Sequence, residues 1–219
     1  MKKHETQLKT QRLTLTPMTD VQINELIGSA PDDEMRKAYT EMLCGCTEHP
    51  DDRLWYAPWN IKLNKSGEPV GDACFKGPQT GGAVEIGYGI YTPHEGRGYA
   101  TEAAKALISW AFSHDDVYFA EAETEPSNKA SQRVLDKLSF KPFGEGKEGP
   151  RFRLEKPAPQ WTAIYMCLGM AIGLSIGSML DNPVIGMCIG LLGGMCVGQY
   201  FDTSDKKRRS ALRNEPDLR

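Results

Sequence analysis

The sequence predicts an α+β domain with one central, mostly antiparallel sheet flanked by helices, followed by a pair of apolar helices. Strand and helix patterns interleave over residues 1–157, and most strands neighbour one another in sequence. The composition then changes, because Asp181 is the only charged residue between Trp161 and Phe201. A chain of 219 residues holds one ordinary domain of roughly 100 to 150 residues plus this tail.

The first half of the domain combines a strand, helices and a hairpin. Residues 12–17 alternate leucine and threonine, which predicts a strand, and residues 20–45 predict one or two helices interrupted at Pro31. Two apolar segments, 55–63 and 70–75, flank a cluster of turn residues and predict an antiparallel hairpin.

The second half continues with alternating strands and helices. Residues 84–91 are apolar at every second position, which predicts a strand, and apolar residues spaced three and four apart predict a helix over 101–112. The remaining expected elements are a strand at 117–123, a helix at 128–138 and two short strands within 140–154.

Composition excludes several function classes. Lys and Arg number 26 against 29 Asp and Glu, so bulk charge does not indicate a nucleic-acid partner. The six cysteines form no paired framework, and the histidine spacing suggests no metal site, so we expect reduced cysteines and no bound metal. The polar N-terminus lacks the apolar core of a secretory signal, so the domain is expected in the cytosol.

The most informative segment is a glycine-rich turn at residues 95–101, between a predicted strand and a predicted helix. Such a turn exposes backbone N–H groups at a helix N-terminus, where the helix dipole favours an anion. The P-loop pattern is absent, and Gly87-Tyr88-Gly89 lacks the third glycine of a dinucleotide fingerprint. The segment therefore predicts a phosphate site of another kind.

Three segments carry a resemblance to a known family: 85–88, 96–103 and 128–135. They resemble the GNAT N-acetyltransferase superfamily, and more narrowly its RimJ/RimL-like branch, the ribosomal-protein alanine N-acetyltransferases. The resemblance covers residues 10–156. It implies a GNAT-like fold and an enzyme that transfers the acetyl group of acetyl-CoA to a primary amine, on a protein N-terminus or a small molecule.

The resemblance also implies cofactor contacts. Main-chain amides of the turn are expected to wrap the CoA pyrophosphate, with Glu95 in a position where the family usually has Gln or Arg. The end of the preceding strand is expected to pair with the pantetheine arm, much as an added strand would. The cofactor-binding residues so implied are Ile90, Tyr91, Gly96, Arg97, Gly98, Tyr99, Ala100, Thr101 and Asn128.

Two residues are candidates for handling protons. An amine must be neutral to attack a thioester, and Glu85 is the expected base, acting directly or through a water. Ser131 is expected to donate to the departing thiolate, where many family members use a tyrosine. Structural alternatives remain open: Glu85 as a solvated strand residue, Ser131 as a helix-surface or capping serine, and Asn128 as the residue that begins its helix.

The tail predicts a membrane hairpin with spans at 161–180 and 184–201, each close to the length that crosses a bilayer. Basic residues lie outside the spans, which places both ends, and the catalytic domain, on the cytoplasmic side of a multi-pass protein. Glycines at every fourth position favour close helix packing in lipid, within the chain or in a homo-oligomer. A buried soluble oligomerisation hairpin and a flexible apolar segment are the alternatives. The expected domains are 1–157, 158–201 and a basic tail at 202–219.

Two other functions remain open. The domain could be a catalytically silent acetyl-CoA sensor, or it could cap a small membrane oligomer whose activity lies in the tail. The acceptor is also open, since the acidic segments near residues 32–34 and 48–52 could recruit a cationic amine or be plain solvated surface.

Overall fold

The computed structural model describes residues 6–78 and 81–213, and it divides into two compact units, Met1–Lys156 and Pro157–Arg219. The first unit confirms the expected α+β class. Its described strands form one sheet in the order β1-β2-β3-β4-β5-β6-β8-β7. The strands are β1 (Leu8–Lys9), β2 (Leu13–Pro17), β3 (Trp59–Leu63), β4 (Pro69–Phe75), β5 (Ala83–Ile90), β6 (Phe119–Glu123), β7 (Lys141–Glu145) and β8 (Pro150–Glu155).

Neighbouring strands are antiparallel except β5 and β6, which pair in parallel. A parallel pair needs a crossover connection, and the helix α3 (Tyr99–Ala111) supplies it. The fold therefore places the glycine-rich turn directly after β5, at the start of the crossover helix.

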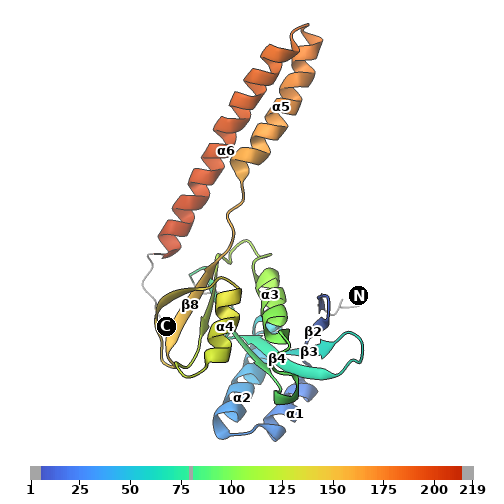
Figure 1. Cartoon of the computed structure of the whole chain (residues 1–219), viewed down its shortest axis with the longest axis vertical. Coiled ribbons are helices and arrows are strands. Elements are labelled where there is room, and N and C mark those ends of the chain that lie inside the picture. The colour runs from blue at the N-terminus through green and yellow to red at the C-terminus, as the bar shows by residue number, and fades with distance from the viewer. Residues whose placement is uncertain (1–5, 79–80, 214–219) are drawn as a thin grey trace. The chain divides into compact units, whose positions relative to one another are not determined.

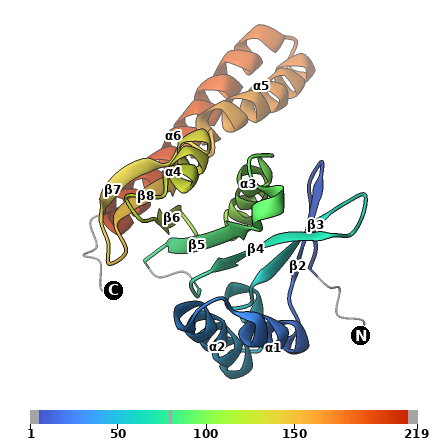
Figure 2. The same ribbon diagram turned by 60° about the horizontal axis from the view of Figure 1, so that its bottom comes forward.

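Helices cover both faces of the sheet, as Figure 2 shows. The helices α1 (Asp20–Ser29) and α2 (Asp33–Glu48) lie on one face, and α3 lies on the other, where α4 (Lys129–Lys137) contacts it. Side-chain caps begin three of them: Thr19 forms a capping box with Gln22 at α1, Asp32 caps α2, and Asn128 caps α4. Two short 3-10 turns, η1 (Arg53–Trp55) and η2 (Thr92–His94), complete the unit.

The main core lies between the sheet and α3. The apolar side of α3 is fully covered, and the inward side chains of β2 to β6 pack against it. A second, smaller core joins α1 and α2 to the other face through Met18, Ile23 and Tyr39. The three-and-four spacing of apolar residues in the sequence therefore matches the pattern of buried residues on α3.

The structure differs from expectation in several elements. Trp55 is in a 3-10 turn, where its ring packs on Phe75 and Trp110, and the strand begins only at Trp59. The short strand β1 was not expected, since two residues give no readable alternation. Helix α3 begins at Tyr99, directly after the glycine turn, rather than near Thr101.

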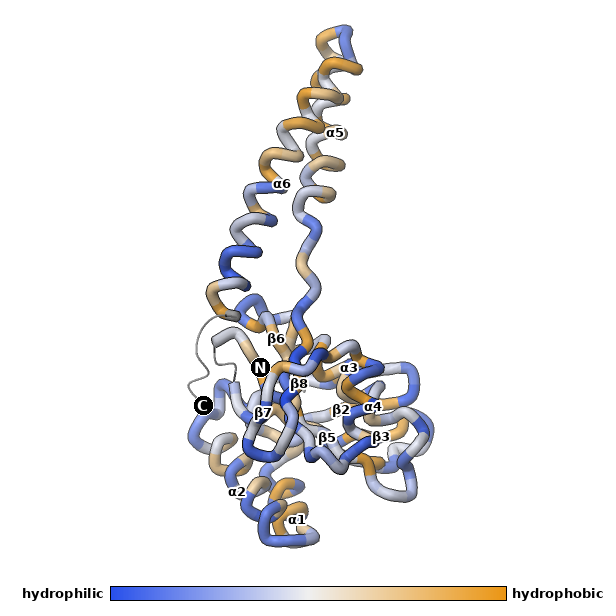
Figure 3. Tube along the Cα trace, turned by 60° about the vertical axis from the view of Figure 1, so that its left-hand side comes forward, coloured by the Kyte–Doolittle hydropathy of each residue, from blue (hydrophilic) through white to orange (hydrophobic). Residues whose placement is uncertain are grey.

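The second unit is an antiparallel pair of helices, α5 (Trp161–Met179) and α6 (Pro183–Arg213), which run side by side (Figure 1). Both are long and apolar enough to cross a membrane by length and composition. Large apolar side chains such as Ile164, Leu174 and Ile189 are about half exposed. Figure 3 shows the apolar character over α5 and the first part of α6, with a hydrophilic stretch further along α6.

Two glycine rows, Gly169, Gly173 and Gly177 on α5 and Gly186, Gly190 and Gly194 on α6, face each other within the chain. A Cβ on Gly169 or Gly173 would collide with the backbone carbonyl of Gly190 or Gly186, respectively, so glycine is required for this approach. Helix α6 does not end at Phe201 but continues to Arg213, because the segment 202–213 has no helix-breaking residue. The carboxylate of Asp202 accepts hydrogen bonds from the backbone nitrogens of Trp161 and Thr162, both at 3.1 Å, and so caps α5.

Candidate functional site

The loop before α3 presents backbone N–H groups at the start of a helix. Gly96 and Gly98 have φ angles of 73° and 78°, a left-handed conformation that glycine adopts without strain. Gly98 is the N-cap of α3 and has no side chain to cap it, so the first-turn amides are open to an anion. The predicted pyrophosphate residues all lie here: Gly96, Arg97, Gly98, Tyr99, Ala100 and Thr101.

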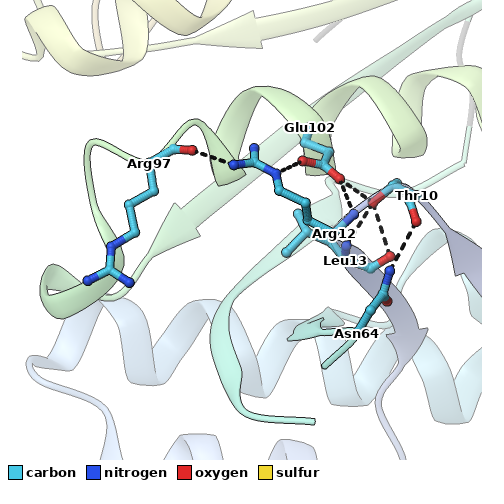
Figure 4. A network of polar contacts seen from close by, with 6 residues as sticks. All are labelled: Thr10, Arg12, Leu13, Asn64, Arg97 and Glu102. Atoms are coloured by element: carbon cyan, nitrogen blue, oxygen red, sulfur yellow. Dashed lines mark hydrogen bonds and ion pairs between the residues drawn. The ribbon is translucent and has the colours of Figure 1, made fainter. Parts of the chain in front are cut away.

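A network of polar contacts fixes this loop against the start of the sheet (Figure 4). The Glu102 carboxylate accepts from Thr10 Oγ1 at 2.6 Å, from the Arg12 backbone nitrogen at 2.8 Å and from Arg12 Nε at 2.6 Å. The Arg12 Nη1 donates to the Arg97 carbonyl at 2.9 Å, and its guanidinium lies over the Tyr99 ring. Arg12 therefore positions the glycine-rich turn at residues 95–101.

Burial alone would raise the pKa of the Glu102 carboxyl, but the hydrogen bonds from Thr10 and Arg12 outweigh it and hold that pKa below its usual range. No local pattern in the sequence indicates this network, since Arg12 and Glu102 are 90 positions apart. A hollow of about 760 Å³ opens beside it, and Lys9, Arg12 and Lys105 are among the side chains that line it. Cationic side chains therefore gather next to the loop that exposes the amides.

Strands β5 and β6 separate beside this loop. Their parallel pairing covers Ala83–Glu85 and Phe119–Glu121, and it stops there. Among the described strands, the remainder of β5, from Ile86 to Ile90, pairs only with β4. The edge of β5 that faces β6 thus has strand hydrogen-bonding groups available to an extended ligand, and the predicted Ile90 is the last residue of this edge. Tyr91 follows it and is 42% exposed.

Ser131 lies against β5 on the α3 side of the sheet. The Tyr88 hydroxyl is 3.1 Å from the Ser131 hydroxyl, an interaction in which either oxygen can donate. Burial raises the pKa of the Tyr88 phenol, and the hydrogen bond with Ser131 opposes this in part, so the phenol is protonated near neutral pH. The sequence did not indicate a role for Tyr88, because its place in the alternating pattern of the strand is that of an ordinary core residue.

Asn128 is engaged as a helix cap. Its side-chain oxygen accepts a hydrogen bond from the Ser131 backbone nitrogen at 2.9 Å. This is the local role that the sequence left open for Asn128, and contact of its side chain with a cofactor stays a prediction.

Glu85 lies on the opposite face of β5 from Tyr88, since side chains alternate along a strand. The Lys76 ammonium is 2.7 Å from Glu85 Oε1 and 3.3 Å from Glu148 Oε1. Burial alone would lower the pKa of Lys76, but the two carboxylates outweigh it and raise it. The candidate base thus has an ion-pair partner that the sequence did not indicate.

A further carboxylate on the Glu85 face was also missed. Asp72 on β4 accepts a hydrogen bond from the Tyr39 hydroxyl of α2 at 3.1 Å. Burial raises the pKa of the Asp72 carboxyl, and the Tyr39 hydrogen bond opposes the rise. Within residues 6–78 and 81–213, no group of three or more His, Cys, Asp and Glu side chains is arranged to hold a metal ion.

Comparison with known proteins agrees with this geometry. The sequence profile of the family described as "Acetyltransferase (GNAT) domain" matches residues 12–141. The chain is 40% identical over 83 residues to the uncharacterized N-acetyltransferase YjdG of Bacillus subtilis, covering 37% of this chain and 49% of the relative. It is 33% identical over 109 residues to the uncharacterized N-acetyltransferase p20 of Bacillus licheniformis, covering 49% and 58%. The chain spans about half the length of these curated relatives.

Solved structures show the same fold. An acetyltransferase from Agrobacterium tumefaciens is 25% identical with a TM-score of 0.54, covering 68% of this chain and 94% of that one. A ribosomal-protein-S5-alanine acetyltransferase from Vibrio fischeri is 15% identical with a TM-score of 0.56, covering 70% and 100%. Mycobacterium smegmatis RimJ, solved in complex with CoA-disulfide, is 19% identical with a TM-score of 0.53, covering 69% and 88%. The last two identities show a shared fold alone.

The family profile matches more than half of the chain, and the opened β5–β6 pair and the glycine loop at α3 agree with it, so this protein belongs to the GNAT acetyltransferase family.

Proposed function

We propose that this protein is an acetyl-CoA-dependent N-acetyltransferase that acetylates a primary amine, on a protein N-terminus or a small molecule, at the cytoplasmic face of a membrane. One observation carries the proposal: the β5–β6 pairing stops at Glu85 beside a helix N-terminus that exposes its amides. The curated relatives described as N-acetyltransferases support the same activity.

The residues present fit acetyl-CoA. Its pyrophosphate would be held by the amides from Gly96 to Thr101, with the α3 dipole and the nearby cations favouring the negative charge. The amides of its pantetheine arm would pair with the free edge of β5 up to Ile90. When bound, acetyl-CoA supplies a thioester whose acetyl carbon bonds to the amine nitrogen while the C–S bond breaks.

The general base and the general acids lie on opposite faces of β5. Glu85 assists the loss of a proton from the amine on one face, and the Ser131 and Tyr88 hydroxyls donate to the departing thiolate on the other. This division keeps base and acid apart, with the opened edge of β5 between them. A thiol has a pKa of about 8.5 by analogy with cysteine, so the thiolate needs only a modest donor.

The second unit is proposed to insert in a bilayer as a hairpin, with both ends cytoplasmic. Its large apolar side chains are exposed, as expected of a surface that lipid covers. Aromatic rings of Trp161, Tyr165, Tyr200 and Phe201 cluster at the open end of the hairpin, where an interfacial belt is expected. Because the glycine rows pack on each other within the chain, an oligomer through these rows would have to displace that contact.

The activity is tested by acetyl-CoA turnover with the full-length protein in detergent, using free thiol release and a panel of peptides and small amines. We expect amine-dependent thiol release that falls on the order of a hundredfold in Glu85→Gln. Saturable acetyl-CoA binding without turnover on any amine would favour a silent sensor instead. Absence of acetyl-CoA binding would overturn the proposal and favour the hairpin as the functional part.

The orientation is tested with a membrane-impermeant maleimide on intact cells, in variants with one cysteine each. A cysteine in the turn, Asn182→Cys, should be labelled from outside, whereas exposed Cys44 of the domain should be labelled only after lysis. The reverse pattern would contradict the proposed topology, and full release of the protein by alkaline carbonate would exclude insertion.

A further inference from the structure

Asp72 is an ionisable side chain on the acceptor face of the sheet that the proposed proton transfers do not use. It pairs across β4–β5 with Gly89 and across β3–β4 with Asn60. It therefore shares a face with Glu85, because Gly89 and Glu85 are four positions apart on β5 and so point to the same side.

The two carboxylates differ in their partners. Glu85 is ion-paired with Lys76, whereas the contact that the described residues give Asp72 is the hydrogen bond from the Tyr39 hydroxyl. A phenol supplies one neutral donor, and an ionised carboxylate has sites for about four. Burying the Asp72 carboxylate without a cation beside it costs free energy, and the raised pKa of this carboxyl reflects that cost.

The strand next to Asp72 leaves room for a ligand. Gly89, its partner on β5, has no side chain, and a Cβ built there would meet no atom within 4 Å. Gly87, one pair further along, is likewise bare on this face, with only the Cys74 sulfur near it. Both glycines belong to the part of β5 whose edge is open toward β6, so the space adjoins the proposed thioester site.

A second buried acceptor atom lies on the strand next to Asp72. Asn60, across from Asp72 on β3, has a buried side-chain oxygen that receives no hydrogen bond from the described residues. Cross-strand neighbours lie about 5 Å apart at Cβ, so this oxygen and the Asp72 carboxylate belong to one locality. A carboxylate with one neutral donor, next to an amide oxygen that receives no hydrogen bond, matches a primary ammonium, which has three donors and no acceptor.

We propose that Asp72 determines specificity by binding the ammonium group of the acceptor, so that the protein selects cationic alkyl amines over neutral acceptors; this inference rests on the proposed acetyltransferase function. Asp72 binds and orients, and Glu85 keeps its place as the base. The acetyl acceptor is therefore a small molecule or a peptide with an aliphatic amine that is charged in solution.

The test measures binding to the full-length protein saturated with CoA, in detergent and at constant ionic strength. The probes are n-butylammonium chloride and, as a neutral match of similar shape, n-butanol, both titrated by calorimetry. We expect butylammonium to bind the parent protein about tenfold to a hundredfold more tightly than Asp72→Asn, as removal of a charge-assisted contact predicts. Butanol should not distinguish the two proteins.

Three controls separate binding from folding. Asp72→Glu keeps the charge and should retain most of the preference for butylammonium, whereas Asp115→Asn removes an exposed charge elsewhere and should change nothing. Asp72→Asn should bind acetyl-CoA as tightly as the parent and should not melt at a lower temperature. With an acceptor in hand, Asp72→Asn should raise KM far more than it lowers kcat, the opposite of Glu85→Gln.

The outcomes distinguish this inference from the proposed function. Equal butylammonium binding by the parent and Asp72→Asn, or no binding by either, overturns the role of Asp72 while acetyl-CoA binding leaves the proposed function standing. A parent protein that binds no acetyl-CoA overturns the proposed function itself, and the role of Asp72 falls with it.

Discussion

Gly98 offers the sharpest test of the proposed phosphate site, because the backbone strain and the charge introduced by its replacement can be separated. Its φ of 78° lies in the left-handed region, so any side chain adds about 1–2 kcal/mol of backbone strain. A new Cβ would meet Arg12 Nη2 at 3.5 Å, an ordinary contact. Gly98→Gln and Gly98→Glu therefore carry the same strain and nearly the same volume, and they differ in one negative charge.

The charge effect can be estimated from Coulomb's law. A carboxylate about 5 Å from one phosphate charge, at an effective dielectric of about 20, is repelled by about 3 kcal/mol before salt screening. We therefore expect Gly98→Glu to bind acetyl-CoA on the order of tenfold to a hundredfold more weakly than Gly98→Gln.

The assay is calorimetry with the full-length protein at low and high salt. The gap between the two variants should narrow as salt increases, since screening acts on the charge and not on the strain. Equal affinities for Gly98→Gln and Gly98→Glu at low salt would refute a phosphate site at this loop. Affinities equal to that of the parent would show that the loop does not contact the ligand.

Three further predictions concern the acid, the network and the hairpin. Tyr88→Phe and Ser131→Ala should each lower kcat about tenfold without weakening acetyl-CoA binding, and the double variant should lose less than the product, because the hydroxyls act as a pair. Glu102→Gln should reduce the free energy of unfolding by about 1–2 kcal/mol after allowance for the half-exposed Arg12. The pKa of Glu102 is lowered in the folded state, so this contribution is complete above the unfolded pKa of about 4.3 and is lost as pH falls through the folded pKa. The free energies of unfolding of the parent and Glu102→Gln, measured by urea titration, should therefore converge between pH 7 and pH 3. A difference that stays constant over this range would contradict the network. Gly173→Leu should lower the melting temperature of the hairpin in detergent, whereas Gly193→Leu, where a Cβ meets nothing within 4 Å, should not; equal effects would exclude the observed packing.

The sequence by itself determined the fold class and the glycine-rich turn at the start of α3. Alternation over β5, the spacing of apolar residues on α3 and the glycines at 96 and 98 are local signals, because each reports the backbone conformation and burial of its own segment. The two long apolar helices could also be recognised from the sequence, because Asp181 is the only charged residue between Trp161 and Phe201 and each apolar segment is long enough to cross a bilayer.

Only the tertiary structure decided which side chains meet. The sheet brings Tyr88 to Ser131, Lys76 to Glu85 and Asp72 to Tyr39, from positions up to 43 residues apart, and no local pattern marks such pairs. The roles of Glu85, Ser131 and Asn128 in chemistry stay predictions. Burial, cross-strand register and the separation of β5 from β6 are properties of the assembled sheet, so the partner of each ionisable group could be known only once the strands were placed side by side.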